Sequence, residues 1–549
     1  MLLPKIAKCL SIGSVSDNFL TDWKLHSDSE KETLNMIVDT IQKFLSSKEA
    51  DFKEYDEKGE QPKSYIDELK NLGLFGLIIP EEFGGLGLSS AGYARTLEEV
   101  AKYDGSTALT IGAHSSIGMK GILLFGNLEQ KKKYLPKLSS GETIAAFCLT
   151  ESGSGSDAAS IKTKAELQPD GSWILNGEKI WITNGPIADI FTVFARTDSK
   201  DGSMSAFIVE RIEGLSHGKK ENKLGIRASA TSTVSFNNLK LRADQLLGEP
   251  GQGFKIAMAI LNNGRTGLGG GCVGAMKRSL KLAENHASER KQFGKSIREF
   301  GLIKEKLAQM KVDIYATESI VGTVCKLIDR DSDDYSIEAA ISKVFATEKL
   351  WNVSNEALQV AGGTGYMKEY AYEMIIRDAR INLIFEGTNE VLRLYIGLTT
   401  LKHVGDYLKN VAKSFSNPVK YFKSLADYIS KKIFESSTIA RCNLNKIGKI
   451  FPDEIEGLLR DIAEISKVSE HLIKKYRKNI INEQLHVKRF ADCLIDTAVS
   501  LTTLGKATSD KNEVSINLAK MFCKQARRRV NMNLRRINLS NEDQLIESV

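Results

Sequence analysis

The spacing of apolar residues changes twice along this chain, and this order constrains its fold more than any other feature. Residues 30–45, 65–72 and 89–103 place apolar side chains three and four positions apart, which is typical of amphipathic helices. Between about residues 142 and 247 the pattern becomes a series of short β-like runs. Long helical runs, such as residues 301–330 and 337–360, resume after residue 253. A helical region, a β-region and a second helical region therefore follow one another.

The β-region contains short apolar runs that we expect to form an antiparallel β-domain inserted between the helices. The runs are residues 144–150, 173–175, 179–183, 190–195, 205–209 and 231–236. Asp-Gly or Asn-Gly pairs at residues 170–171, 176–177 and 201–202 are typical of the turns between such strands. We expect a ligand cleft where the β-domain meets the helices, because binding sites favour domain boundaries.

We predict an α+β fold in five parts. These are a targeting segment or tail over residues 1–27, an N-terminal helical domain over 28–141, a middle β-domain over 142–250, a C-terminal four-helix bundle over 251–402 and an appended basic helical domain over 403–549. Residues 1–16 carry Lys5 and Lys8 and no acid, so they are faintly similar to a mitochondrial presequence, and a frayed tail is the alternative.

The charge is uneven along the chain. From residue 401 onward there are 27 Lys and Arg against 17 Asp and Glu, whereas the first 400 residues contain 49 against 52. A basic terminal region is suited to anionic lipid or an acidic partner. Nucleic acid ranks last, because no nucleic-acid-binding motif accompanies the charge.

Cysteine, histidine and hydropathy patterns argue against three other classes of protein. The seven cysteines are odd in number and lack C-x-x-C spacing, and the seven histidines form no H-x-x-x-H pair. We therefore expect neither a disulfide framework nor a metal site. The longest uncharged stretch, residues 105–119, is rich in Gly, Ser and Thr, so we expect no membrane-spanning helix.

Two segments of the β-region have the composition of a cofactor site. Residues 150–157 (TESGSGSD) offer hydroxyls and backbone amides without bulky side chains, which suits a phosphate or a polar ring edge. A solvated Ser/Gly loop is the alternative. Trp181 and Thr183 are two residues apart on a predicted strand and so would share one face, offering an aromatic plane and a hydroxyl. A half-buried core tryptophan is the competing interpretation.

Two segments of the second helical region have similar features. Residues 290–294 (RKQFG) follow a long helix and offer a guanidinium for phosphate beside an amide and a ring. Residues 359–366 (QVAGGTGY) end another helix with glycines that allow close backbone approach. An ordinary helix C-cap would explain the same glycines.

Glu386 lies in residues 384–390 (IFEGTNE), between an apolar pair and a helix start that Thr388 or Asn389 would cap. Apolar neighbours would raise its pKa toward that of a general base, and Gly387 leaves room for a substrate carbonyl. An exposed acid before a helix is the simpler alternative.

A G-x-G-x-x-G pattern at residues 269–274 would usually mark a dinucleotide site. Here it lies inside a helical run over residues 254–287 and not after a strand, so we assign its glycines to tight helix packing.

These five chemical segments, in this order and spacing, resemble the acyl-CoA dehydrogenase family over about residues 30–400. Residues 261–265 (LNNGR) and the appended region, including residues 481–484 (INEQ), are similar to the mitochondrial very-long-chain branch and its relative that acts in complex I assembly.

The resemblance implies FAD-dependent oxidation of a long-chain acyl-CoA to trans-2-enoyl-CoA, with electrons passed to electron-transferring flavoprotein. It also implies a homodimer in the mitochondrial matrix with peripheral contact to the inner membrane. We place that contact at residues 444–451, where Lys446 and Lys449 alternate with apolar residues. A complex I assembly protein that retains the fold, with assembly factors as partners, and an acyl-CoA oxidase are the alternatives.

The resemblance also implies roles for particular residues, with Glu386 as the base that removes the α-proton. FAD would contact Phe147, Leu149, Thr150, Gly155, Ser156, Trp181, Ile182, Thr183, Arg290, Gln292, Phe293, Gln359, Gly362, Gly363, Thr388 and Asn389. Of these, Arg290, Gln292, Phe293 and residues 359–363 would reach the FAD of a partner subunit. Acyl-CoA would contact Ser156, Asn262, Asn263, Arg265, Phe385 and Gly387.

Four further positions bear on the resemblance, and two of them, Ser152 and Gly301, depart from the family pattern. Gly264 stands where some relatives carry the base, which favours Glu386. Ser152 replaces a common proline and Gly301 a common glutamine, and both changes would loosen FAD retention. Small residues at 111–114 predict a deep tunnel for long acyl tails.

Overall fold

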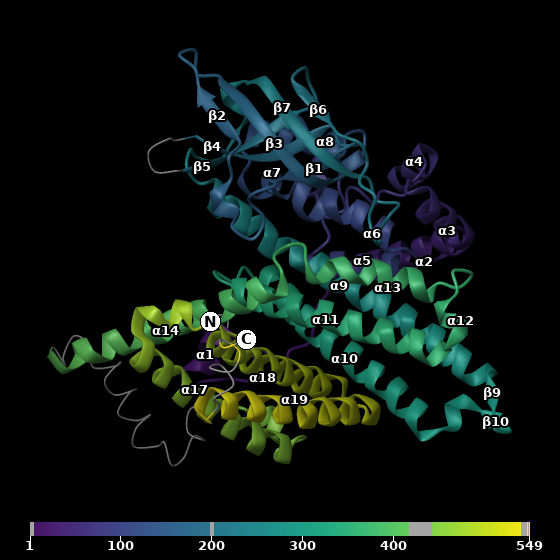
Figure 1. Cartoon of the computed structure of the whole chain (residues 1–549), viewed down its shortest axis with the longest axis vertical. Helices are drawn as coiled ribbons and strands as arrows, with labels where there is room; N and C mark the ends of the chain where they lie inside the picture. The colour runs from purple at the N-terminus through teal and green to yellow at the C-terminus, as the bar shows by residue number, and fades with distance from the viewer. Residues whose placement is uncertain (1–4, 198–202, 417–441, 540–545, 547, 549) are drawn as a thin grey trace. The chain divides into compact units, whose positions relative to one another are not determined.

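The computed structural model describes residues 5–197, 203–416, 442–539, 546 and 548, with side chains omitted for residues 411–416 and 539. The chain packs as two compact units (Figure 1). Unit 1 comprises Met1–Leu25, Lys304–Lys349 and Thr388–Val549, and unit 2 comprises His26–Ile303 and Leu350–Gly387. Both units therefore combine segments that are distant in the sequence.

The first helical region of unit 2 forms where apolar spacing and capping residues predict it. Its helices are α2 (Asp28–Ser47), α3 (Glu49–Lys58), α4 (Lys63–Asn71), α5 (Ser90–Ala101), α6 (Gly105–Gly112), α7 (Lys120–Phe125) and α8 (Leu128–Ser140). The Ser27 hydroxyl caps α2 by accepting from the Glu30 amide, and Asn127 with Gln130 forms a capping box on α8.

The uncharged stretch after Asp104 is buried inside the fold. By length and composition, Gly105–Phe125 is apolar enough to cross a membrane, and among the described residues it is the one segment that meets this test. The structure divides it into α6, a π-helical turn (Ala113–Gly118) and α7. More than half of its most apolar window, 56%, is buried, as expected of a core helix.

The β-region forms a mixed sheet in unit 2. Its strands are β1 (Ala145–Cys148), β2 (Lys164–Leu167), β3 (Trp173–Thr183), β4 (Ile190–Arg196), β5 (Met204–Glu210), β6 (Leu215–His217), β7 (Thr231–Leu241) and β8 (Leu246–Leu247). The order is β6-β7-β3-β2-β4-β5-β8, with β1 beside β4. The predicted β-domain is confirmed, but it is not wholly antiparallel, because β1 and β2 both pair parallel with β4.

The predicted turn at residues 176–177 is wrong. The two flanking runs form the single strand β3, whose register against β7 shifts between Leu175 and Gly177. Gly177 has φ 147°, and an added Cβ would lie 2.5 Å from Thr163 Oγ1. The glycine therefore serves a β-bulge, which is its other common use within strands. The predicted pair at residues 201–202 lies outside the described residues.

Helix α9 (Gly253–Glu289) contains the G-x-G-x-x-G pattern, so the pattern does not follow a strand. An added Cβ at Gly270 would lie 2.1 Å from the Ala94 carbonyl oxygen, and one at Gly274 would lie 2.0 Å from that of Glu98. These distances allow no side chain, so the glycines let α5 and α9 pack backbone to backbone. The prediction of tight helix packing is confirmed.

The later helices also agree with the predicted runs. They are α10 (Gly301–Asp329), α11 (Ser336–Ala361), α12 (Gly363–Tyr366), α13 (Tyr372–Arg380), α14 (Asn389–Ser416), α16 (Asn445–Gly448), α17 (Pro452–Tyr476), α18 (Gln484–Asp510) and α19 (Glu513–Leu539). The last four, which form most of the appended region, pack around one hydrophobic core with α14.

The N-terminal segment belongs to that same core. Helix α1 (Ile6–Ser11) contacts α14, α17 and α18, and Ile6, Leu10 and Leu20 are almost fully buried. The Asp17 carboxylate accepts hydrogen bonds from the backbone amides of Lys446 and Ile447 at the start of α16. Residues 6–25 are therefore not a frayed tail but a packed part of unit 1.

Candidate active site

The Ser/Gly loop after β1 is fixed by a buried ion pair. The Glu151 carboxylate accepts from Lys179 Nζ at 2.8 Å and from the Thr163 amide at 3.0 Å, and the fully buried Lys179 also donates to the Leu149 carbonyl at 3.0 Å. Burial acts to raise the pKa of Glu151, but the hydrogen bonds from Lys179 and Thr163 outweigh it and lower the pKa. Gly155 and Ser156 are left exposed at the open side of the loop.

Trp181 presents an aromatic ring at the surface, with 64% of the residue exposed. Its φ of 57° is left-handed, and the register of β3 shifts between Lys179 and Ile182. The argument from strand alternation therefore fails here, because Trp181 projects from an irregular segment. Ile182 is buried and Thr183 is half-buried, while Phe147 and Thr150 are half-buried and Leu149 is buried beneath the loop.

The two helical segments lie at exposed positions of unit 2. Arg290 ends α9, and Gln292 and Phe293 lie in a small hairpin, β9 (Lys291–Gln292) with β10 (Lys295–Ser296). Phe293 is 93% exposed and has φ 50°. Gln359 is exposed, and Gly362, with φ 59°, and Gly363 have no described atom within 4 Å of an added Cβ. These groups are open to a ligand or a partner.

Glu386 lies in a strained turn before α14. Its φ is 54° and that of Gly387 is 91°, and left-handed backbone at a bulky residue is common at functional sites. Arg265, which is 5% exposed, donates from Nη2 to the Glu386 carbonyl at 3.3 Å and from Nη1 to Asn262 Oδ1 at 2.6 Å. The structure thus brings the predicted base together with predicted acyl-CoA residues on α9.

The Glu386 side chain is half-buried, and its charge acts on Tyr93, a residue that the sequence did not single out. Tyr93 on α5 shares a hydrogen bond of 2.7 Å with Ser116 Oγ of the π-helical turn. Burial raises the pKa of Tyr93, and the charge of Glu386 raises it further. Residues 93 and 116 look like ordinary helix positions in the sequence, so only the fold could reveal them. Phe385 is half-buried, Asn263 is buried, and Ile384 is 47% exposed.

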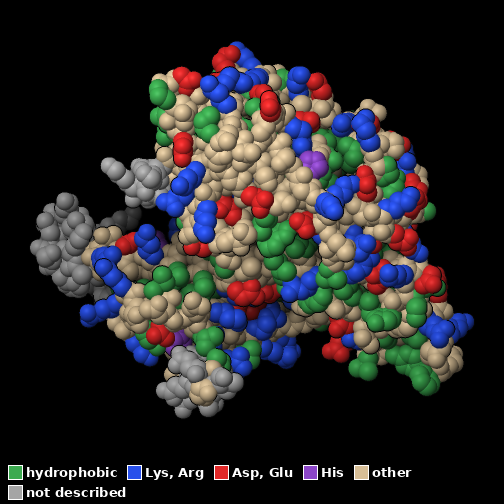
Figure 2. Space-filling view, turned by 45° about the horizontal axis from the view of Figure 1, so that its top comes forward, with side chains coloured by type: hydrophobic (Ala, Val, Ile, Leu, Met, Phe, Trp, Pro, Cys, Tyr) green, Lys and Arg blue, Asp and Glu red, His purple; other side chains and the backbone are tan. Residues whose placement is uncertain are grey.

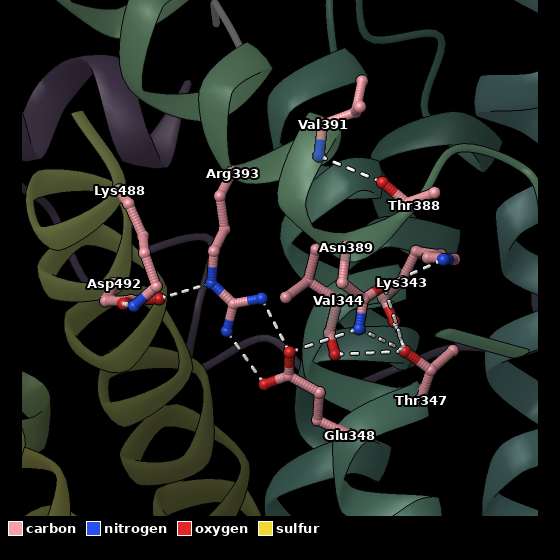
Figure 3. A network of polar contacts seen from close by, with 10 residues as sticks. All are labelled: Lys343, Val344, Thr347, Glu348, Thr388, Asn389, Val391, Arg393, Lys488 and Asp492. Carbon is pink, nitrogen blue, oxygen red and sulfur yellow. Dashed lines mark hydrogen bonds and ion pairs between the residues drawn. The ribbon is translucent and has the colours of Figure 1, made fainter. Parts of the chain in front are cut away.

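Thr388 and Asn389 begin α14 and belong to unit 1. Thr388 Oγ1 accepts from the Val391 amide at 3.3 Å, so Thr388 caps the helix as predicted (Figure 3). Asn389 is 1% exposed, and its side chain bonds to Lys343 and Thr347. The Asn389 amide is therefore engaged inside unit 1, and the expected contact of Asn389 with FAD stays a prediction.

Comparison with known proteins decides the family. A very long-chain specific acyl-CoA dehydrogenase, mitochondrial, from Bos taurus is 41% identical over 531 residues, covering 92% of this chain and 80% of that protein. The chain belongs to the acyl-CoA dehydrogenase family. The human protein of the same name is 44% identical over 457 residues, 81% of this chain and 70% of that protein.

The domains of an acyl-CoA dehydrogenase match in order along the chain. Residues 31–142 match the N-terminal domain, 146–239 the middle domain and 251–400 the C-terminal domain. Residues 452–549 match the C-terminal domain described as ACAD9/ACADV.

Two solved structures show the same fold. Acyl-CoA dehydrogenase complexed with FAD from Bacillus anthracis superposes with TM-score 0.84 and 33% identity, covering 98% of this chain and 93% of that chain. Butyryl-CoA dehydrogenase from Megasphaera elsdenii gives TM-score 0.66 and 39% identity, covering 68% of this chain and 99% of that chain. The family uses FAD, and the exposed Trp181 ring and the open loop at Gly155 and Ser156 fit a flavin, which needs a stacking surface and backbone donors.

Proposed function

We propose that this acyl-CoA dehydrogenase converts long-chain acyl-CoA to trans-2-enoyl-CoA in mitochondria, with Glu386 as the base and electron-transferring flavoprotein as the final acceptor. The observation that carries the proposal is the placement of Glu386: a half-buried carboxylate in a strained turn, with its backbone held by the buried Arg265. A base on such a turn is fixed before substrate arrives.

Different groups would bind the thioester carbonyl, remove the α-proton and accept the hydride. The backbone amide of Glu386 would donate to the thioester carbonyl and so acidify the α-carbon by stabilising enolate-like charge. The Glu386 carboxylate then takes the α-proton while the β-hydrogen leaves with its electron pair. FAD, held by Thr150, Gly155, Ser156 and Trp181, supplies the hydride acceptor when bound.

We place the tail of a long acyl chain near residue 112, which is a glycine. Gly112 is half-buried, and among the described atoms an added Cβ there would meet Leu97 Cδ1, at 3.8 Å. The adjacent His114 is structural: its ring bonds to the Leu138 carbonyl and to the Ala145 amide, and burial lowers its pKa to about 4. The relatives named very long-chain specific support the same preference.

Glu386→Gln tests the assignment of the base. Loss of the carboxylate should slow flavin bleaching by acyl-CoA by about 10³-fold, because general-base catalysis contributes 10²–10⁴-fold. The yellow, folded flavoprotein should persist. Glu390→Gln is the matched control, since Glu390 is exposed four residues later, and it should keep its rate. An unimpaired Glu386→Gln enzyme would refute the proposal, and peroxide production without an acceptor protein would indicate an oxidase.

We also propose that a second copy of the chain completes the FAD site. Several large apolar residues of unit 2 are exposed, including Phe293 at 93%, Tyr366 at 76% and Leu302 at 75%. Exposed large apolar side chains such as these are suited to contact with a partner subunit. In this dimer Arg290, Gln292, Phe293 and residues 359–363 would contact the partner's FAD.

Peripheral contact with the inner mitochondrial membrane is a further proposal, but its predicted location is wrong. Leu444, Ile447 and Phe451 are buried in the core of unit 1, so residues 444–451 present no apolar face. Figure 2 shows basic and acidic side chains interspersed on one face of the molecule. Helix α19 differs from this mixed surface, because after Glu513 it carries seven Lys and Arg and no acid. We therefore place the contact on α19.

A groove of about 620 Å³ supports this location. It is lined by Lys524, Arg527, Arg528, Asn531, Met532, Arg535 and Arg536. Arg527 is paired with Asp461 at 3.1 Å. Lys524 and Arg528 are exposed and have no ion-pair partner among the described residues. An anionic phospholipid headgroup complements this groove. An acidic assembly factor of complex I is the rival occupant.

A further inference from the structure

A buried polar network surrounds the side chain of Asn389, three residues after Glu386 (Figure 3). Asn389 Oδ1 accepts from Lys343 Nζ at 2.8 Å, and its Nδ2 donates to Thr347 Oγ1 at 3.0 Å and to Glu348 Oε1 at 3.2 Å. Lys343 and Thr347 are fully buried. Three residues of α11 therefore hold the first residue of α14.

The network continues from Glu348 into the appended region. Arg393, one turn into α14, donates through both terminal nitrogens to the Glu348 carboxylate, at 2.6 and 2.9 Å. Its Nε donates to Asp492 Oδ1 on α18 at 2.7 Å, and the other Asp492 oxygen accepts from Lys488 at 2.8 Å. Arg393 is thus shared by two carboxylates, one from α11 and one from α18 (Figure 3).

We propose that the appended helical region positions the catalytic base through this network. Asp492 orients Arg393, Arg393 orients Glu348, and Glu348 with Lys343 fixes Asn389 at the start of the helix that follows Glu386. Asp492 is a positioning residue and not a catalytic one, because it acts on Glu386 only through Arg393 and helix α14. The inference rests on the proposed role of Glu386.

The physical reason is that the turn at Glu386 needs contacts from other parts of the protein to keep its conformation. Glu386 has left-handed backbone, which is strained at a residue with a side chain, and such a conformation persists only where its surroundings fix it. Arg265 fixes the Glu386 carbonyl on one side. On the other side the chain enters α14, whose first residue is held by the network. Charge-assisted bonds to a shared guanidinium are directional and strong when partly buried, and the Arg393 side chain is 14% exposed.

Asp492→Asn tests the proposal, with Asp496→Asn as the matched control. Asp496 lies one turn later on α18 and is equally charge-paired, accepting from Arg529 at 2.6 and 3.0 Å, but its partner is on α19 and not on α14. The Asp492→Asn holoenzyme should bleach its flavin about 5–20-fold more slowly at saturating acyl-CoA, with KM changed less than twofold, since a misplaced base lowers the chemical step alone. The Asp496→Asn enzyme should stay within twofold of the parent.

Two further readouts separate positioning from stability. With α-deuterated acyl-CoA the isotope effect on bleaching should rise in Asp492→Asn and not in Asp496→Asn. Amide hydrogen exchange over residues 384–393 should accelerate about tenfold in the Asp492→Asn variant alone, a readout that needs no activity. Unchanged exchange in this variant, or equal rate losses in both variants, would overturn the inference. If the parent enzyme failed to bleach with acyl-CoA, the proposed function would fall while exchange still decided whether Asp492 braces the turn.

Discussion

Glu338 on α11 is a buried carboxyl group that makes unit 1 sensitive to pH. Its carboxyl accepts from the Ala7 amide at 3.1 Å, next to Lys8 and Asp334, and burial raises its pKa from 4.5 to about 7. The pKa of Glu338 is higher in the folded protein than in the unfolded chain. The contribution of Glu338 to the free energy of unfolding is therefore complete below about pH 4.5 and is lost as the pH rises through about 7. Glu338→Gln should therefore stabilise the protein above pH 7 by up to about 3 kcal/mol.

The check is denaturant unfolding at pH 5 and pH 8. The gain of the Glu338→Gln variant over the parent should be several-fold larger at pH 8, and Glu513→Gln, at an exposed acid, should show no such difference. A gain that is equal at both pH values would contradict the raised pKa.

At the residue scale, local motifs predicted the residues of the site better than the residues that hold them in place. Glu386 and the loop at residues 150–157 stand out because chemistry-bearing residues and glycines are adjacent in the sequence. Lys179 and Tyr93 could not be predicted as site residues, because their roles come from partners 28 and 23 positions away, Glu151 and Ser116. The partners of the Asn389 side chain could not be predicted for the same reason, since they are on α11.

Helix α19 is the element on which we expect an anionic membrane to act. Lys524 and Arg528 lie one turn apart and share an exposed face beside the basic groove. Changing both to Glu should weaken binding to phosphatidylglycerol-containing vesicles at least tenfold at about 0.1 M salt, because each basic residue near such a surface contributes about 1 kcal/mol. Vesicle co-sedimentation over a salt series measures the effect.

The matched control is Lys446→Glu with Lys449→Glu. Both lysines are exposed on the α16 segment, but the apolar residues between them face the core. The affinity of this control variant for the vesicles should fall less than threefold. Equal losses of vesicle binding in the two double variants would indicate nonspecific charge attraction. If the α19 variant still bound vesicles but no longer bound an acidic assembly factor, a protein partner would be favoured.

Helices and strands were predicted well where one periodicity ran without interruption. Runs such as residues 337–360 became single helices, here α11. Errors arose where one residue serves two structures: the Asn-Gly pair at 176–177 is typical of a hairpin turn, yet Gly177 relieves a close approach to Thr163 inside β3. Short strands such as β6 were missed because three residues carry no periodicity.

The whole chain is organised by long-range packing that a linear division into domains does not predict. Unit 1 joins the first 25 residues to segments that begin at Lys304 and Thr388. Lys326 Nζ, for example, donates to the Phe19 carbonyl at 2.5 Å and to the Asp22 carbonyl at 2.6 Å, and lies 4.0 Å from the centre of the Phe19 ring. Such contacts leave no local trace in the sequence, so the segment looked like a tail.

Truncation of this segment should therefore unfold unit 1. Removing residues 1–25 exposes the sites of Ile6, Leu10, Phe19 and Leu20, all at most 9% exposed, and each such burial contributes roughly 1.5–3 kcal/mol. The sum is comparable to the whole stability of a typical domain, about 5–15 kcal/mol. The truncated protein should be insoluble or lose its cooperative thermal transition. A soluble, flavin-containing protein that begins at residue 26 and melts like the parent would show instead that the segment is dispensable, as a cleaved presequence would be.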